Sequence, residues 1–281
     1  MILIADSGAT KSDWILINRG NEHMRFQLVG MNPYYIDSKQ IESIISKDLI
    51  PFIDGKAIKK VYFYGAGCSS VYKSMTVEEA LIKLFRNAEI HVESDLIGAA
   101  RALFGSKPGI ACILGTGSNS CYYDGSKIVQ NITSLGYFLG DEGSGAHMGK
   151  TFIKDYLLGN LPEEINARFK KDYNYSRDNI LDAIYNLPFP NRYLASFCEF
   201  YADNLSNKYI FELITNSFRE FFINQIEQYE QHKRVPLCFT GSVAFFFEAL
   251  LRQIATEFEV KVDKVLRSPI NALADFHKDM R

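Results

Sequence analysis

The amino-acid sequence predicts an α/β protein that is built from two similar halves. Two short turns carry this prediction, one at residues 6–12 (DSGATKS) and one at residues 115–120 (GTGSNS). Each turn follows an apolar run and precedes a second run, as the loop of a β-hairpin does. A similar order of strands and helices follows each turn, which indicates a duplicated domain.

The first half is predicted to contain three strands, followed by helices that alternate with two more strands. Apolar residues recur every three to four positions in the helices and form short runs in the strands. Ser38 is placed to cap the first helix, and Thr76 with Glu79 forms a capping box for the second. A tight turn is expected at residues 19–21. The predicted strands are 1–5, 13–18, 24–29, 61–64 and 90–92, and the predicted helices are 38–50, 76–85 and 96–104.

The second half repeats the hairpin, helix and strand order without obvious sequence identity. Residues 136–149 are rich in glycine and predict a loop, whereas residues 192–229 contain few helix breakers and predict mostly helix. The boundary between the halves is expected near residues 105–109. The predicted strands are 110–114, 121–123, 127–131, 235–239 and 260–262, and the other predicted helices surround 152–157, span 244–258 and follow Pro269.

The composition is that of an ordinary globular protein, and it argues against several classes of protein. The 281 residues are 47% hydrophobic and 23% charged, and the net charge of −2 provides no general attraction to nucleic acid or anionic membranes. No apolar run reaches the roughly 20 residues of a membrane span, and an acid at residue 6 comes too early for a signal peptide. The five cysteines form no CxxC pair, which favours buried free thiols. We therefore expect a cytoplasmic protein with no nucleic-acid and no membrane partner.

The two glycine turns are the best candidates for binding phosphate. Backbone N–H groups and hydroxyls of small residues can surround a phosphate. Neither turn is a P-loop or a Rossmann fingerprint, because GxxxxGK[ST] is absent and a strand, not a helix, follows each turn. The alternative for residues 115–118 is an ordinary hairpin turn, although Ser118 and Asn119 add polar groups that such a turn does not need.

Carboxylates at predicted strand ends and in a glycine-rich loop are candidates for chemistry. Asp6 could hold a hydrated Mg²⁺ beside nucleotide phosphates, or it could satisfy donors of the local turn. Asp95 could act as a general base toward a substrate hydroxyl, or it could cap the helix that follows. Glycines flank Asp141 and Glu142, which favours a loop that binds substrate hydroxyls over a simple turn and helix cap.

Four motifs together resemble those of the actin-like ATPase superfamily, which contains sugar kinases, actin and the Hsp70 chaperones. More narrowly, the chain resembles the N-acetylglucosamine kinase branch of the BadF/BadG/BcrA/BcrD ATPase family over essentially its whole length. The motifs are residues 6–12, 115–119, 140–144 and 240–243. The resemblance implies two ribonuclease-H-like lobes around a central nucleotide and sugar cleft. Residues 1–106 would form one lobe, together with the C-terminal helix 269–281, and residues 107–268 would form the other.

The resemblance also implies an ATP-dependent phosphorylation of N-acetylglucosamine at its 6-hydroxyl, by a homodimer. The implied ATP-binding residues are Asp6, Gly8, Thr10, Lys11, Gly115, Thr116, Gly117, Gly241, Ser242 and Val243, with Asp6 holding Mg²⁺ through water. The implied sugar-binding residues are Asn32, Asp95, Ser118, Asn119, Gly136 and Asp141, with Asp95 as the general base.

The chain departs from the family pattern at several positions. Ser7 and Ala9 replace residues that are often glycine, Leu135 stands where some relatives have a sugar-stacking tryptophan, and residues 271–272 lack a usual glycine. Glucosamine, a muramic-acid derivative and a glucose-like hexose therefore stay open as substrates. Two other functions on this fold also stay open: an ATPase that activates a partner through a cysteine-bound iron–sulfur cluster, and a sugar-sensing module without catalysis. The scattered cysteines disfavour the first, and the presence of Asp95 disfavours the second.

Overall fold

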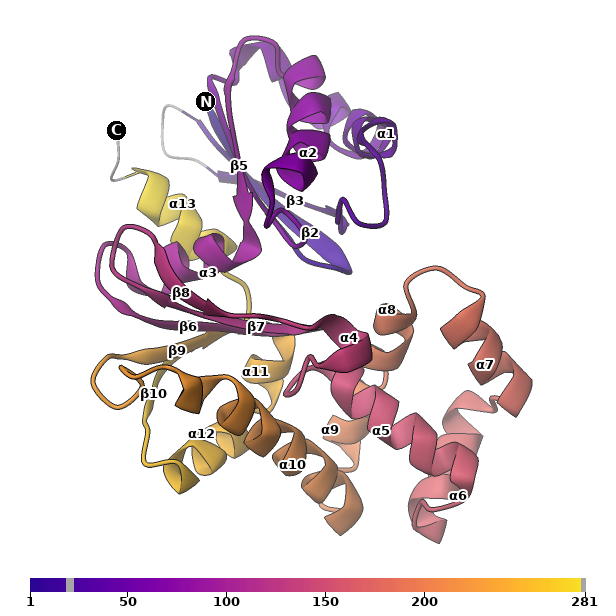
Figure 1. Cartoon of the computed structure of the whole chain (residues 1–281). Coiled ribbons are helices and arrows are strands. Elements are labelled where there is room, and N and C mark those ends of the chain that lie inside the picture. Colours follow the sequence, from indigo (N-terminus) through magenta and orange to yellow (C-terminus); the bar gives the residue numbers. More distant parts are fainter. Residues whose placement is uncertain (19–22, 279–281) are drawn as a thin grey trace. The chain divides into compact units, whose positions relative to one another are not determined.

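The computed structural model describes residues 1–18 and 23–278, which form two compact α/β units (Figure 1). Each unit contains one five-stranded sheet, so the predicted α/β class and its duplication are confirmed. The turn predicted at residues 19–21 lies outside the described residues. Unit 1 comprises Met1–Pro108, Tyr123–Ile128 and Ser268–Arg281, and unit 2 comprises Gly109–Tyr122 and Val129–Arg267.

The five strands predicted for the first half all form the sheet of unit 1. They are β1 (Ile2–Ser7), β2 (Lys11–Ile17), β3 (His23–Val29), β4 (Lys60–Gly65) and β5 (Glu89–Ser94). The strand order is β3-β2-β1-β4-β5, in which β1, β2 and β3 are antiparallel while β4 and β5 run parallel to β1. Residues 3–5 are fully buried, as expected for a central strand that is covered on both faces.

Two pairs of helices cover the two faces of this sheet. They are α1 (Ser38–Asp48), α2 (Val71–Leu84), α3 (Asp95–Phe104) and α13 (Ile270–Lys278), with short 3₁₀ turns at Ile50–Phe52 and Gly55–Ala57. α1 packs on α2, and α13 packs on α3. Because side chains alternate along a strand, Val61 and Phe63 of β4 join the core beneath α1 and α2, whereas Tyr62 and Tyr64 contact His277 of α13.

Two predicted helix caps are wrong, and α2 also starts earlier than predicted. Asp37 caps α1 in place of Ser38, since its carboxylate accepts a hydrogen bond from the Gln40 amide at 2.9 Å and the Gln40 side chain accepts one from the Asp37 amide. α2 begins after the cap Ser70, so Thr76 lies inside the helix and its hydroxyl donates back to a carbonyl of the preceding turn. Exposed apolar residues in the first turn of α2 conceal its amphipathic pattern.

The sheet of unit 2 has the strand order β10-β9-β6-β7-β8. Its strands are β6 (Gly109–Leu114), β7 (Ser118–Tyr123), β8 (Ile128–Ile132), β9 (Leu237–Thr240) and β10 (Val262–Leu266). β6, β9 and β10 are parallel, and the first four predicted strands are confirmed. The fifth predicted strand, at 260–262, exists but starts later than predicted, because the chain first turns through Glu259 in the left-handed region (φ 57°) and the strand begins at Val262.

The helical predictions for residues 192–229 and 244–258 are confirmed, although both stretches are divided into shorter helices. The helices of unit 2 are α4 (Gly136–Leu139), α5 (Gly145–Leu158), α6 (Glu163–Tyr173), α7 (Arg177–Tyr185), α8 (Pro190–Ala195), α9 (Cys198–Asp203), α10 (Lys208–Asn224), α11 (Ser242–Phe246) and α12 (Glu248–Glu257), with a 3₁₀ turn at Ile226–Gln228.

The loop predicted at residues 136–149 is wrong in part, because it contains α4 and the first turn of α5. Glycine is used here for close packing and not only for turns. A Cβ atom at Gly149 would overlap the carbonyl oxygen of Leu194, so glycine is what allows α5 to approach α8. Ser144 caps α5 by accepting a hydrogen bond from the His147 amide at 3.2 Å.

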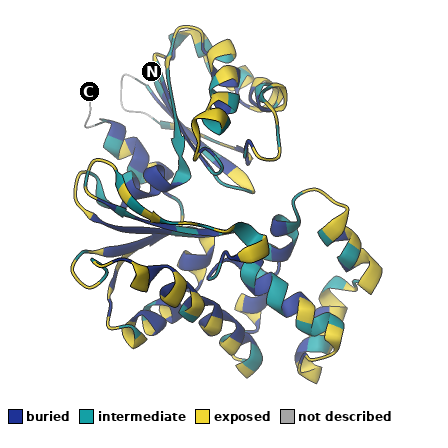
Figure 2. Ribbon diagram, in the orientation of Figure 1, coloured by how far each residue is buried: buried dark blue, intermediate teal, exposed yellow. Residues whose placement is uncertain are grey.

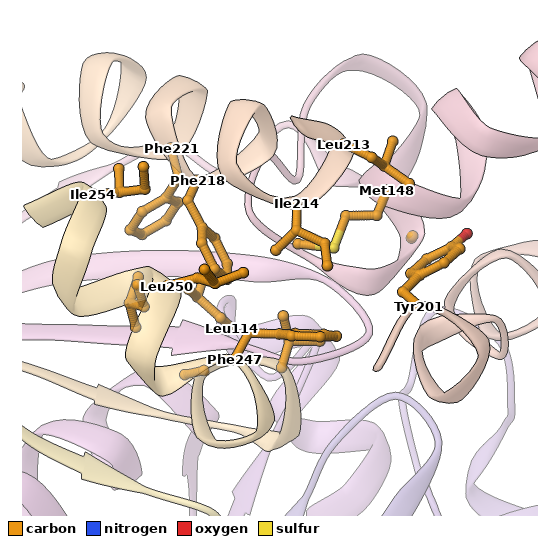
Figure 3. Close-up of a cluster of buried hydrophobic side chains, with 14 of the residues drawn as sticks. Leu114, Met148, Tyr201, Leu213, Ile214, Phe218, Phe221, Phe247, Leu250 and Ile254 are labelled. Atoms are coloured by element: carbon orange, nitrogen blue, oxygen red, sulfur yellow. The ribbon is translucent and has the colours of Figure 1, made fainter. Parts of the chain in front are cut away.

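The core of unit 2 lies between its sheet and the helices α5, α10 and α12 (Figure 2). Figure 3 shows Phe218 and Phe221 of α10 beside Leu114 of β6 and Leu250 of α12. Both phenylalanines are fully buried, which confirms that much of the high aromatic content serves core packing.

Two further predictions concern membranes and cysteines. Within residues 1–18 and 23–278, no helix combines the length and the apolar character that crossing a bilayer requires. All five cysteines are free and four are buried, with Cys198 partly exposed, so the prediction of free thiols is confirmed.

A buried histidine fixes α13 on unit 1. The Nε2 atom of His277 forms a 2.8 Å hydrogen bond with the Tyr64 hydroxyl, which also accepts one from Arg101 at 2.9 Å. The Tyr62 ring stacks on the imidazole, with the ring centroids 3.7 Å apart. Burial, assisted by nearby cationic groups, lowers the pKa of His277 from 6.5 to about 4.

We predict that His277 makes the fold sensitive to acid. The unfolded chain binds a proton at His277 near pH 6.5 and the native chain only near pH 4, so stability falls as the pH drops through this range, by up to about 3 kcal/mol. Chemical denaturation at pH 7.5 and pH 5 measures this loss. In His277→Phe, which keeps an aromatic ring against Tyr62, the loss should be smaller than in the native chain. An equal loss in both proteins would contradict the prediction.

Candidate active site

Three neighbouring strands of unit 1 end at the same edge of its sheet. The register pairs the last residues of β1, β4 and β5, which are Ser7, Gly65 and Ser94. Asp6 in β1 and Asp95 directly after β5 therefore lie at the carboxyl edge of the sheet, where α/β proteins commonly bind ligands. Asp6 also lies directly opposite Asp13 in the β1–β2 hairpin, so the two carboxylates share one face.

The surroundings of Asp6 oppose its negative charge. Burial, together with the nearby carboxylates of Asp95 and Asp13, raises the pKa of Asp6 to about 8, while Lys11 acts in the opposite direction. The Lys11 ammonium is instead 3.1 Å from Asp13, whose oxygens also accept hydrogen bonds from Gln27 and Ser268. Sequence reasoning missed Asp13 as a site residue, although its place across the hairpin turn from Asp6 was available as a signal.

The carboxylates of unit 1 fit a hydrated cation. Across the part of the chain that the structure describes, no three His, Cys, Asp or Glu side chains are grouped to hold a metal ion. Mg²⁺ is commonly bound by one or two carboxylates while water and substrate phosphates complete its octahedron. Asp6 suits this role, because a cation would stabilise the ionised form of a carboxyl group whose pKa is raised by burial and by neighbouring carboxylates.

Asp95 is the first residue of α3 and does not cap it. Ser94 is the cap, and its hydroxyl accepts a hydrogen bond from the Ile97 amide at 3.4 Å, so the alternative role of Asp95 as N-cap is wrong. Burial raises the pKa of Asp95 to about 6, while hydrogen bonds from the amides of Leu96 and of Asp95 itself oppose that shift. A partly buried carboxylate with this pKa suits a general base that works near neutral pH.

The first glycine turn connects β1 to β2, and the backbone of Gly30 packs against it and forms a hydrogen bond with it. The Gly8 amide donates to the Lys11 carbonyl at 2.9 Å, and the Gly30 amide donates to the Thr10 carbonyl at 3.0 Å. A Cβ atom at Gly30 would overlap the Gly8 carbonyl oxygen, so the fold requires glycine there. The sequence shows Gly30 only as a break in the strand pattern, which hides this role.

Gly8 differs, because the fold does not require a glycine at its position. A Cβ atom on Gly8 would meet the Lys11 carbonyl oxygen at an ordinary contact distance of 3.6 Å, and Gly8 is not among the residues with a positive φ. No contact within the described protein explains the glycine at this position. A ligand that binds close to the backbone of the turn would explain it, because a side chain would then be in the way.

Asn32 lies at the same edge of unit 1. Its Oδ1 atom accepts a hydrogen bond from the Tyr34 amide at 2.9 Å. The Asn32 side chain contacts Gly67, which follows the end of β4, and a Cβ atom at Gly67 would overlap it. The structure therefore brings Asn32 to the strand end that lies between those of Asp6 and Asp95.

The second glycine turn connects β6 to β7 in unit 2. The Gly115 amide donates to the Gly117 carbonyl at 3.0 Å, and the first amides of α5 donate to the carbonyls of Gly115 and Thr116 at 2.9 and 3.0 Å. A Cβ atom on Gly115 would have no heavy atom within 4 Å, and its φ is not positive. As at Gly8, the fold leaves the choice of glycine unexplained, and close approach of a ligand would explain it.

Asp141 lies beside this turn. Its carboxylate accepts hydrogen bonds from the Ser118 amide and from the Ser134 hydroxyl, the latter at 3.2 Å, and Oδ2 would be 2.7 Å from a Cβ atom at Gly117. Burial is the main cause that raises the pKa of Asp141. Gly136 is the first residue of α4, and its amide lies 3.5 Å from the Ser134 hydroxyl. The structure therefore brings four predicted site residues together around Ser134, which are Gly117, Ser118, Gly136 and Asp141.

Asn119 is held by a residue that sequence reasoning missed. Its Oδ1 atom accepts hydrogen bonds from the Ser120 amide at 2.9 Å and from Asn131 Nδ2 at 3.0 Å. The same Asn131 amide group donates to the Ser120 carbonyl at 2.7 Å. No signal in the sequence marks Asn131, since it looks like any polar residue in a strand.

The turn after β9 differs from the other two glycine turns. Gly241 has a φ of 117°, and a Cβ atom there would overlap the Leu114 carbonyl oxygen, so the fold itself requires this glycine. The side chain of Val243 is 3% exposed and belongs to the core, which leaves Ser242 as the motif's more accessible side chain. Phe246 is 60% exposed, and the Arg267 guanidinium lies 5.2 Å from its ring centroid, a pair that the motif did not reveal.

Comparisons with known proteins found similar chains among solved structures. No family model matches the chain, and no curated protein matches it. Among solved structures, a putative N-acetylglucosamine kinase from Porphyromonas gingivalis is 41% identical, with 99% of each chain covered and a TM-score of 0.94. A putative N-acetylglucosamine kinase from Chromobacterium violaceum is 13% identical over 98% of each chain, with a TM-score of 0.71. A ROK family glucokinase from Streptomyces griseus, in complex with glucose and AMPPNP, is 14% identical over 99% of this chain and 98% of its own, with a TM-score of 0.57.

The Chromobacterium violaceum and Streptomyces griseus structures establish the fold of this chain, and the Porphyromonas gingivalis structure establishes its family. The fold is the duplicated, two-lobed α/β fold of sugar kinases and other actin-like ATPases. The identity to the Porphyromonas gingivalis protein extends over nearly the full length of both chains. The chain therefore belongs to the same family as that putative N-acetylglucosamine kinase.

Proposed function

We propose that this protein is an ATP-dependent kinase that phosphorylates N-acetylglucosamine at its 6-hydroxyl. The observation that carries the proposal is the 41% identity over 99% of the chain to a putative N-acetylglucosamine kinase. The partly buried Asp95, with a pKa of about 6 at the carboxyl edge of unit 1, supplies the carboxylate that the reaction needs. Asp95 accepts the proton of the sugar 6-hydroxyl. The oxygen of that hydroxyl bonds to the γ-phosphorus of ATP, and the bond between the γ-phosphorus and the oxygen of the ADP leaving group breaks.

The proposed binding residues fall into two sets. ATP is bound by Asp6, Gly8, Thr10, Lys11, Gly115, Thr116, Gly117, Gly241, Ser242 and Val243, the last through its backbone because its side chain lies in the core. The sugar is bound by Asn32, Asp95, Ser118, Asn119, Gly136 and Asp141. The two glycines that the fold does not require, Gly8 and Gly115, support the phosphate assignments. AMPPNP in the Streptomyces griseus glucokinase supports ATP as the phosphate donor.

Mg²⁺ is the proposed metal, and Asp6 is the residue that holds it, through water. When bound, Mg²⁺ neutralises charge on the phosphates. The raised pKa of Asp6 supports this assignment, because a neighbouring cation would favour the ionised carboxylate.

The same proposal has three further parts. They are membership of the BadF/BadG/BcrA/BcrD ATPase family, a cytoplasmic location and a homodimeric state. The motifs GTGSN at residues 115–119 and GDEGS at residues 140–144 support the family assignment.

Sugar-stimulated release of ADP tests the proposal directly. We expect purified protein with Mg-ATP to release ADP at least about tenfold faster with N-acetylglucosamine than without sugar, because the general base needs an acceptor hydroxyl. A panel of glucosamine, N-acetylmuramic acid and glucose tests the choice of sugar. Stimulation by another sugar alone would correct the substrate, whereas sugar-independent hydrolysis would favour the ATPase activator and no hydrolysis would favour the sensing module.

Replacement of Asp95 tests the assignment of the base. We expect Asp95→Asn to lower kcat by roughly 10³-fold, within the range for loss of a general base, while sugar affinity changes little. Steady-state kinetics and calorimetric titration with sugar measure the two quantities. Asp48→Asn, at an exposed position on α1, is the matched control and should behave as the unchanged protein. Near-normal turnover by Asp95→Asn would show that Asp95 is not the base.

Replacement of Gly115 tests the phosphate assignment without disturbing the fold. We expect Gly115→Ala to weaken ATP binding by about tenfold or more, equivalent to about 1.4 kcal/mol, because the added methyl group occupies the space of the ligand. Its melting temperature should stay close to that of the unchanged protein, since the methyl group meets no protein atom. Gly55→Ala, whose Cβ atom would make only ordinary contacts from 3.7 Å, is the control. Unchanged ATP affinity in Gly115→Ala would refute the assignment.

A further inference from the structure

The loop that carries Asp141 is held in an uncommon backbone conformation. Asp141 has a φ of 60° and Gly143 a φ of 77°, both in the left-handed region. This conformation is unfavourable for a residue with a side chain, such as Asp141, and it persists only where surrounding groups impose it. Asp141 is also buried, at 8% exposed, so groups of the surrounding elements are in contact with the loop and can impose its shape.

One face of α10 supplies those groups. Ser217, Phe221 and Asn224 recur at the three-to-four-residue spacing that places side chains on one side of a helix. The Ser217 hydroxyl accepts a hydrogen bond from the Gly143 amide at 3.0 Å, and Asn224 donates to the Glu142 carboxylate at 3.1 Å. Phe221 packs against Gly143, where a Cβ atom would lie 3.0 Å from the Cβ of Phe221.

His147 of α5 completes this support. Its Nδ1 atom is 2.9 Å from the Ser217 hydroxyl, and its Nε2 atom is 3.3 Å from the Glu220 carboxylate. Because Ser217 already accepts from the Gly143 amide, its own hydrogen can be donated to Nδ1, and Nε2–H then donates to Glu220. The neutral histidine thus satisfies every partner. The order of Ser, His and Glu resembles a nucleophilic triad, but Ser217 is 3% exposed and serves a backbone amide.

We infer that Ser217, His147 and Glu220 form a positioning relay that fixes Gly143 and thereby sets the orientation of Asp141 toward the sugar. This inference rests on the proposed role of Asp141 in sugar binding. None of the three residues was assigned to the site from the sequence, and none replaces Asp95 in the chemistry. Burial lowers the pKa of His147, with Lys150 acting in the same direction and Glu220 and Glu142 opposing it, which agrees with a neutral imidazole in the relay.

Removal of the Ser217 hydroxyl tests the relay. We expect Ser217→Ala to raise the sugar KM about tenfold or more, because the buried Gly143 amide loses its acceptor, while the KM for ATP changes by less than about twofold. Thr215→Val is the matched control, since Thr215 is also buried on α10 but bonds only to carbonyls of its own helix. An unchanged sugar KM in Ser217→Ala, or an equal rise in both KM values, would overturn the inference.

Two variants of His147 separate positioning from general packing. His147→Asn can still present an oxygen near the position of Nδ1, whereas His147→Leu cannot accept a hydrogen bond. We expect His147→Asn to keep the sugar KM within about threefold of the unchanged protein and His147→Leu to raise it about as much as Ser217→Ala does. Equal effects of the two variants would refute the relay in favour of a packing role.

Hydrogen exchange at Gly143 makes the test independent of catalysis. We expect its amide to exchange at least about tenfold faster in Ser217→Ala than in the unchanged protein, and not faster in Thr215→Val. If the protein phosphorylates no amino sugar, the proposed function fails while this exchange experiment still decides on the relay. Unchanged exchange in Ser217→Ala would show that Ser217 does not hold the loop.

Discussion

Repulsion between partly buried carboxylates is the constraint on which the site of unit 1 depends. Burial is the largest cause that raises the pKa of Asp6 to about 8, and the charges of Asp95, at the end of β5 two strands away, and of Asp13, opposite Asp6 in the hairpin, act in the same direction. A protein gains no stability from such a group, because a carboxylate of this kind is ionised at neutral pH only at a cost. A cation bound beside Asp6 would stabilise its ionised form, so the arrangement of the strand ends favours the Mg²⁺ site that we propose.

In unit 2, the site depends on helices that hold two loops in place, the Gly115 turn and the loop that carries Asp141. The Gly115 turn is anchored by the first amides of α5, and the neighbouring acidic loop is anchored by side chains of α10. Both helices are held by the core that Phe218 and Phe221 help to form. The polar groups around Asp141 are therefore placed by rigid packing and not by the loop's own preferences, which suits the sugar-binding role that we propose for them.

Most of the strands along the chain, and the carboxylates at two strand ends, could be predicted because they depend on local patterns. The Asp6 hairpin and the strand before Asp95 have clear apolar periodicity. The roles of Gly30, Asn131 and Ser217 could not be predicted, because each acts on a residue that is distant in sequence. The error over residues 136–149 has a related cause: glycine favours turns locally, but here it serves close contact between helices, which only the tertiary structure reveals.

The place of α13 has a consequence for how the protein is made. Unit 1 begins with β1, yet Tyr62 and Tyr64 on one face of its sheet are covered by His277, which is translated after the whole of unit 2. Domains generally fold in the order in which the ribosome releases them. Here one face of the earlier unit's sheet stays incomplete until the later unit has been synthesised, so unit 1 cannot be completed before the whole of unit 2 has been translated.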